Sequence, residues 1–233
     1  KSFGGFRNLR ERAANRVKRA TKDSEEIDYK AIYEEIRHLT NLSKQATLTL
    51  RKLELQYEHK SLSPRLLGQQ LFEYALKANK TIIIVSDMYL PENEIVLMLK
   101  RNNFTQYEKI YVSSSYGKLK KSGTLFTEVR LDYPHQSILH FGDNYTADIK
   151  MPLAHQIDSF HLPIINDYYR NSALFNQNIP WQATQKGLGE SLMHGVISRK
   201  FYDNHHYEDS CFNGDAYMLG YQACGPIILG FAR

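Results

Sequence analysis

The sequence predicts an α/β fold: a Rossmann-like core with a parallel sheet, preceded by a helical segment and followed by a helical extension. Short, unbroken apolar runs rich in β-branched residues recur after residue 80, and amphipathic helical patterns separate them. This alternation is typical of βαβ units, whose strands pair in parallel. A length of 233 residues with 42% hydrophobic residues is that of a globular protein, which excludes collagen-like and largely disordered classes.

The first 80 residues are predicted to be helical. Phe6, Leu9, Ala13 and Val17 recur at intervals of three or four, which is the apolar stripe of an amphipathic helix. Similar patterns predict helices around 32–39 and 48–57. Pro64 is predicted to open a fourth helix that continues to about residue 75, because proline is favoured at the first helical position.

Residues 81–165 are predicted to form the sheet core. Strands are expected at 81–85, 110–112, 138–141 and 157–160, with helices at 95–99, 125–129 and 149–153 between them. Residues 166–233 carry helical patterns at 188–201 and 216–231, which predict the C-terminal extension.

Basic residues crowd the predicted N-terminal helix. Between Lys1 and Lys22, Glu11 is the only acid, while the whole chain has a net charge of +5. Arg12 and Arg16 are among the bases. A helix of this kind binds an anionic substrate, nucleic acid or an anionic membrane surface, or else it is simply solvated.

Cysteine content and hydropathy bear on where the protein works. Cys211 and Cys224 are too few for a disulfide framework, so we expect a reducing, cytoplasmic setting. No apolar stretch reaches the roughly 18 residues that a membrane span requires. The sequence therefore predicts no membrane span.

Polar residues follow three of the predicted strands. Ser86, Ser113 and Asp143 each come directly after a strand or one residue later, and Lys120 and Lys121 lie on the loop between the second and third. Ligands of open parallel sheets bind beyond the carboxyl ends of the strands. Hydroxyl, ammonium and carboxylate groups at that edge suit a phosphate and a Mg²⁺ ion.

Three segments resemble motifs of the haloacid-dehalogenase (HAD) phosphohydrolase superfamily. They are IIIVSDMYLP at 82–91, KKSGTLF at 120–126 and HFGDNYTAD at 140–148, which are similar to its second, third and fourth motifs in the same order. The combination of the motifs SDMYLP and GDN resembles that of a bacterial branch of the superfamily, in which some members are fused to, or encoded with, glycosyltransferases. The resemblance implies an HAD-like core with residues 1–80 as a helical cap.

The resemblance also implies an activity and residue roles. It implies Mg²⁺-dependent hydrolysis of a phosphate monoester of a small metabolite through an aspartyl-phosphate. Ser86 would bind the phosphoryl group and Lys120 would neutralise it, with Lys121 as the alternative. Asp143 would ligate Mg²⁺, and Asp148 would ligate it or orient its waters.

The cap arginines and the remaining polar clusters are open to more than one interpretation. Arg12 and Arg16 are expected to attract the anionic substrate, so nucleic acid is not the expected partner. Asp143 could instead be a turn residue or a helix N-cap. A separate polar cluster could bind a metal but is more typical of a solvated loop; it comprises Asp203, His205, His206, Glu208 and Asp209.

The first HAD motif, DxDx(T/V), which supplies the aspartate nucleophile, does not occur before Ser86. We expect its strand to lie upstream of Lys1. The alternative is an HAD-fold binding or regulatory module that lacks the nucleophile.

Overall fold

The computed structural model describes residues 3–167, 195–196, 198–199 and 203. The predicted helices at 188–201 and 216–231 fall almost entirely outside these residues. Within the described part of the chain, no helix combines the length and apolar character needed to cross a membrane.

The chain divides into two compact units. The first comprises Lys1–Pro64 and Phe72–His161, and the second comprises Arg65–Leu71 and Leu162–Arg233. The helices before residue 62 and all four described strands belong to the first unit, which also holds the candidate site.

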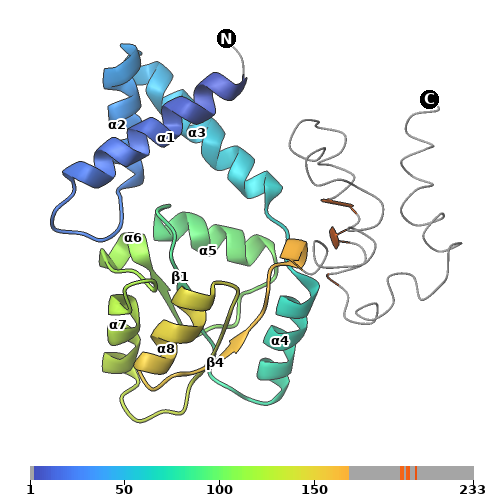
Figure 1. The fold of residues 1–233 in the computed structure, drawn as a ribbon. Helices are drawn as coiled ribbons and strands as arrows, with labels where there is room; N and C mark the ends of the chain where they lie inside the picture. The colour runs from blue at the N-terminus through green and yellow to red at the C-terminus, as the bar shows by residue number, and fades with distance from the viewer. Residues whose placement is uncertain (1–2, 168–194, 197, 200–202, 204–233) are drawn as a thin grey trace, which may run out of the picture. The chain divides into compact units, whose positions relative to one another are not determined.

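The predicted N-terminal helices are confirmed. They are α1 (Phe3–Ala20), α2 (Tyr29–Thr40) and α3 (Lys44–Ser61), followed by α4 (Leu66–Lys77). Helix α1 packs on α2, and α2 packs on α3 (Figure 1). Helix α2 begins after Asp28, whose carboxylate accepts the backbone N–H groups of Lys30 and Ala31.

The strands alternate with helices, as the sequence predicts, so the α/β class is confirmed. The elements are β1 (Ile83–Ser86), α5 (Glu92–Arg101), β2 (Lys109–Val112), α7 (Thr124–Asp132), β3 (Leu139–Gly142) and β4 (Asp158–His161). Strand β1 pairs with β2, and β3 pairs with β4, both in parallel.

The four strands form two separate two-stranded sheets, whereas the sequence predicts one sheet. An apolar run identifies a strand that is buried, but it does not determine which neighbour pairs with which edge. The described residues contain no strand that links β1 to β3. The structure therefore supports the general α/β class, and an HAD-specific core stays a prediction.

Three short helices refine the predicted pattern. The serines after β2 form α6 (Ser113–Tyr116), a single turn that the sequence does not signal. The predicted helix at 149–153 is split into a π-helix, η1 (Tyr145–Lys150), and α8 (Met151–Ala154). Isolated π-helical turns are rare and occur often at functional sites.

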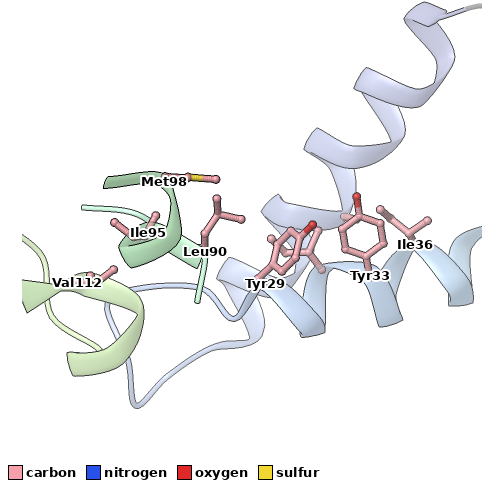
Figure 2. Close-up of a cluster of buried hydrophobic side chains, with 9 residues drawn as sticks. Tyr29, Tyr33, Ile36, Leu90, Ile95, Met98 and Val112 are labelled. Atoms are coloured by element: carbon pink, nitrogen blue, oxygen red, sulfur yellow. The ribbon is translucent and has the colours of Figure 1, made fainter. Parts of the chain in front are cut away.

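Two hydrophobic clusters meet at β2. Figure 2 shows Tyr29, Tyr33 and Ile36 of α2 in the cluster that also contains Ile95 and Met98 of α5. Neighbouring residues of a strand point to opposite faces. Accordingly Val112 belongs to this cluster, while Tyr111 belongs to a second one with α7. Strand β2 therefore contacts a hydrophobic cluster on each face, and these contacts hold its C-terminal end in place.

Candidate functional site

Asp87 anchors the lysine loop to the end of β1. This carboxylate follows Ser86 directly and accepts the backbone N–H of Lys120 at 2.6 Å and that of Lys121 at 3.2 Å. Strand β1 is held beside β2 by parallel pairing, in which Ser86 lies opposite Val112. The loop that carries both lysines is therefore fixed at the carboxyl end of β1.

The far end of this loop requires Gly123. Its φ of +86° is left-handed, and a Cβ there would lie 2.6 Å from Cε1 of His155. Glycine is the residue that adopts this conformation without strain. The turn lets α7 begin directly at Thr124, so the lysine loop is held at both ends.

Lys120 forms a buried ion pair with Asp148. The Nζ atom lies 2.6 Å from Oδ1, and the two side chains are 14% and 1% exposed. His140 of β3 places Nε2 at 2.9 Å from the same oxygen, and the Asn144 N–H donates to Oδ2 at 2.9 Å. The arrangement joins the loop after β2 to the residues that follow β3.

These contacts keep Asp148 ionised. Burial alone would raise the pKa of its carboxyl. The hydrogen bond from His140, the charge and hydrogen bond of Lys120 and the Asn144 N–H outweigh that effect and hold the pKa below its usual range. Asp148 therefore acts in this structure as a fixed negative charge that positions the Lys120 ammonium.

The turn after β3 places the Asp148 side chain against Gly142, the last residue of β3. A Cβ on Gly142 would lie 2.2 Å from Cγ of Asp148, so only glycine permits this approach. The Asn144 side chain accepts the N–H groups of Thr146 and Ala147 and caps η1. Asp143, between them, is exposed, and no hydrogen bond joins its carboxylate to the described residues.

The structure brings some predicted site residues together and leaves others apart. Lys120 and Asp148 are in direct contact, and Ser86 adjoins Asp87, which anchors the lysine loop. The Ser86 hydroxyl makes no hydrogen bond within the described part of the chain. Lys121 is exposed and joins the network through its backbone alone.

The predicted cap arginines lie on the exposed side of α1. Arg12 and Arg16 border a surface hollow together with Arg19. Arg16 pairs with Glu35 at 2.8 Å. Among the described residues, none of the hydrogen bonds or ion pairs of these arginines reaches the lysine loop or the turn after β3.

Of the two predicted metal ligands, Asp143 has the carboxylate that is available to a cation. Mg²⁺ is commonly held by one or two carboxylates, with waters and substrate phosphate completing its shell. Asp143 offers an unengaged carboxylate, whereas both oxygens of Asp148 already accept hydrogen bonds. In the described residues, no three His, Cys, Asp or Glu side chains converge into a metal-binding group. Any direct role of Asp148 in metal binding stays a prediction.

Four residues of this region were not identified as functional from the sequence. Glu25 accepts hydrogen bonds from Ser122, Thr124 and the Leu119 N–H, which lowers its pKa. Glu26 accepts the Ser113 hydroxyl, whose oxygen accepts the Met88 N–H. The other two are His140 and Asp87. The position of Asp87 beside Ser86 was a usable signal, but nothing in the sequence links the two glutamates to loops some 90 residues away.

The second polar cluster is described only at Asp203. Its carboxylate accepts the Leu66 N–H at 2.9 Å and pairs with Arg65 at 3.3 Å. The remaining members of that predicted cluster lie outside the described residues, as do Cys211 and Cys224.

Comparison with models of known protein families gives no match, and comparison with curated proteins gives none either.

Proposed function

We propose that this chain supplies the phosphate- and Mg²⁺-binding part of an HAD-type hydrolase acting on a phosphate monoester of a small metabolite. The observation that carries the proposal is the Lys120–Asp148 pair, together with the unengaged carboxylate of Asp143 directly after β3. A fixed ammonium and a free carboxylate beyond the ends of parallel strands are what a phosphoryl group and its metal require.

Each residue has a defined task in this proposal. The Ser86 hydroxyl donates a hydrogen bond to a phosphoryl oxygen, and the Lys120 ammonium neutralises the charge that develops on the phosphoryl group. Asp148 and His140 position the ammonium, and Asp87 fixes the backbone beneath it. Because these groups are held before substrate arrives, little reorganisation is needed during the reaction.

Asp143 would hold the metal. Mg²⁺, when bound, would polarise a phosphoryl oxygen and orient the ester for in-line attack. The Asp143 carbonyl accepts a hydrogen bond from the His161 ring at 2.9 Å, which fixes the backbone of this residue while its side chain stays free.

In the HAD family the nucleophile is an aspartate of the DxD motif, and this motif does not occur in the 233-residue sequence. In the proposed reaction its carboxylate would attack phosphorus while the second aspartate of the same motif donates a proton to the leaving ester oxygen. Water would then hydrolyse the aspartyl-phosphate, which releases phosphate and frees the carboxylate. The lack of the DxD motif in this sequence favours one second candidate, a phosphate-binding module without turnover. A link to a glycosyltransferase and a cytoplasmic setting also stay predictions.

Turnover tests the proposal. The protein is produced with whatever its gene encodes upstream of Lys1, and release of phosphate from an aryl phosphate is measured with and without Mg²⁺. We expect Mg²⁺-dependent turnover that Asp143→Asn abolishes and Asp158→Asn leaves unchanged, since Asp158 is an exposed carboxylate at the start of β4. Equal turnover by the two variants would show that Asp143 is not part of the site. No turnover, with phosphate still bound, would favour the binding module.

A further inference from the structure

A pocket with a volume of about 260 Å³ adjoins Ser86. Its apolar lining includes Leu62, Met88, Ile95, Met98, Leu99 and Phe104. All of these residues belong to the first compact unit. The pocket thus lies between the end of α3, helix α5 and the end of β1.

The wall formed by α5 is part of the hydrophobic core. Ile95 is 8% exposed and Met98 is 5% exposed, and Figure 2 shows both beside Leu90. Met88 and Leu99 pack against the same cluster. A wall anchored in the core keeps its shape, while the flexible thioethers of the two methionines adapt to different apolar groups.

Ser86 provides a polar end for the pocket. Its hydroxyl makes no hydrogen bond within the described residues. Asn102, which also lines the pocket, already donates its side-chain N–H to the Met98 carbonyl at 2.8 Å. No charged side chain lines the pocket among the residues that the structure describes. The lining therefore combines the Ser86 hydroxyl with a mostly apolar interior, in which Ser63 and Asn102 are the other polar residues.

We infer that this pocket binds a compact apolar group, an aromatic ring or a short alkyl chain, of the phosphate monoester whose phosphoryl group Ser86 binds. The inference rests on the proposed function and narrows its substrate class. A cavity of about 150 Å³ with apolar walls is enough to hold benzene, so this one accommodates a ring or a short chain. Ser63, Ser86 and Asn102 are the polar residues of the lining, and a sugar or nucleoside would bury more hydroxyl groups than these three can pair.

Chain length provides the first test. Binding of inorganic phosphate and of methyl-, propyl- and pentylphosphonate is measured by calorimetry with Mg²⁺ present; phosphonates are used because their C–P bond is not hydrolysed. We expect the affinity to rise about fourfold per added methylene until the pocket is full. Equal affinities along the series would overturn the inference while leaving the phosphoryl site intact.

A matched pair of leucine variants locates the effect. Leu62 lines the pocket and is 44% exposed, whereas Leu97 of α5 does not line it and is 51% exposed. Neither replacement by Asn opens a core cavity. We expect Leu62→Asn to weaken pentylphosphonate binding about fourfold with no change for inorganic phosphate, and Leu97→Asn to change neither. The same result from both variants would contradict the inference.

Methionine methyl resonances show where the ligand lies and separate this inference from the proposed function. With ¹³C-methyl methionine, pentylphosphonate should shift the Met88 and Met98 signals and leave that of Met151, which packs in the second cluster, unchanged. Inorganic phosphate should not shift Met98. If pentanol shifts these signals but no phosphonate binds, both the proposed function and the inference fail. If phosphonates bind without shifting them, the inference alone fails.

Discussion

Two of the predicted site residues, Lys120 and Arg16, each pair with one carboxylate, but in contrasting surroundings. The Lys120 and Asp148 side chains are 14% and 1% exposed, and two further groups bind the same carboxylate. The Arg16 and Glu35 side chains are 54% and 21% exposed. The first pair joins the lysine loop to helix η1, which follows β3, whereas the second joins neighbouring helices α1 and α2.

The contrast indicates which predicted residues the fold itself positions. An exposed ion pair stabilises a protein by about 0–1 kcal/mol, because water screens it and the side chains lose freedom. Removing one partner of a buried pair costs far more, because a charge is left without compensation. We therefore expect substitutions at the Lys120 loop to have large effects and those on the exposed side of α1 to have small ones.

The largest effect on stability is expected from Asp148→Asn. The change leaves the buried Lys120 ammonium without its counter-charge, so the free energy of unfolding at pH 7 should fall by about 3 kcal/mol. Denaturant unfolding measures it, with Asp158→Asn as the control that should change stability by less than about 0.5 kcal/mol. Equal stabilities for the two variants would show that the buried pair does not stabilise the fold.

The same variant has a distinctive pH dependence. Because the pKa of folded Asp148 is below its unfolded value, its stabilisation is complete above the unfolded pKa of about 3.9 and is lost as the pH falls toward the folded pKa. The stability difference between wild type and Asp148→Asn should therefore shrink as the pH falls below about 4. A difference that stayed the same from about pH 5 to about pH 2 would contradict the lowered pKa of Asp148.

Lys120→Met tests the electrostatic role of the ammonium. Removing a preorganised donor from a charge-stabilising site typically costs about 10²–10³ in turnover, and we expect a loss of this size for an aryl phosphate. Lys121→Met is the matched control, because Lys121 contributes only its backbone N–H to the network. A larger loss of turnover for Lys121→Met than for Lys120→Met would show that Lys121, and not Lys120, neutralises the phosphoryl group.

A smaller effect is expected at Asp87. Asp87→Asn keeps one acceptor oxygen but weakens two charge-assisted hydrogen bonds, which should lower stability by about 1–2 kcal/mol. Hydrogen exchange should accelerate at the Lys120 and Lys121 amides, while amides within α5 keep their protection. Unchanged exchange at both lysines would mean that Asp87 does not hold the loop.

The smallest effect on stability is expected for the double substitution of Arg12 and Arg16 by Gln. The free energy of unfolding should change by less than about 0.5 kcal/mol. If this side of α1 attracts the anionic substrate, KM should rise at low ionic strength and return to the wild-type value at high salt. An unchanged KM would mean that the arginines are only solvated, and tight DNA binding with a steep salt dependence would favour nucleic acid.

Sequence patterns predicted most elements of the fold because local patterns specify them. The stripe Leu9, Ala13, Val17 lies on α1, and the run 82–85 overlaps β1. The separation into two strand pairs was not predicted, because strand pairing depends on long-range contacts. The π-helix η1 was not predicted either, because no local pattern signals the tight approach of Asp148 to Gly142.

The candidate site was predicted only in part for the same reason. Lys120 and Asp148 were identified through motif resemblance, although as separate groups and not as a pair. His140 lies within an apolar strand, where a histidine gives no signal of its own. Glu25 could not be identified from the sequence, because its hydrogen-bond partners lie nearly a hundred residues further along the chain.

We propose that Lys120 and Asp143 belong to one phosphate- and Mg²⁺-binding site. Phosphate binding to the 233-residue chain tests this proposal without requiring a nucleophile. Calorimetry with inorganic phosphate is carried out with and without Mg²⁺ on wild type, Lys120→Met, Asp143→Asn and Asp158→Asn. We expect Mg²⁺-dependent binding that both site variants lose and Asp158→Asn keeps. Binding of equal strength in all four proteins, or binding indifferent to Mg²⁺, would contradict it.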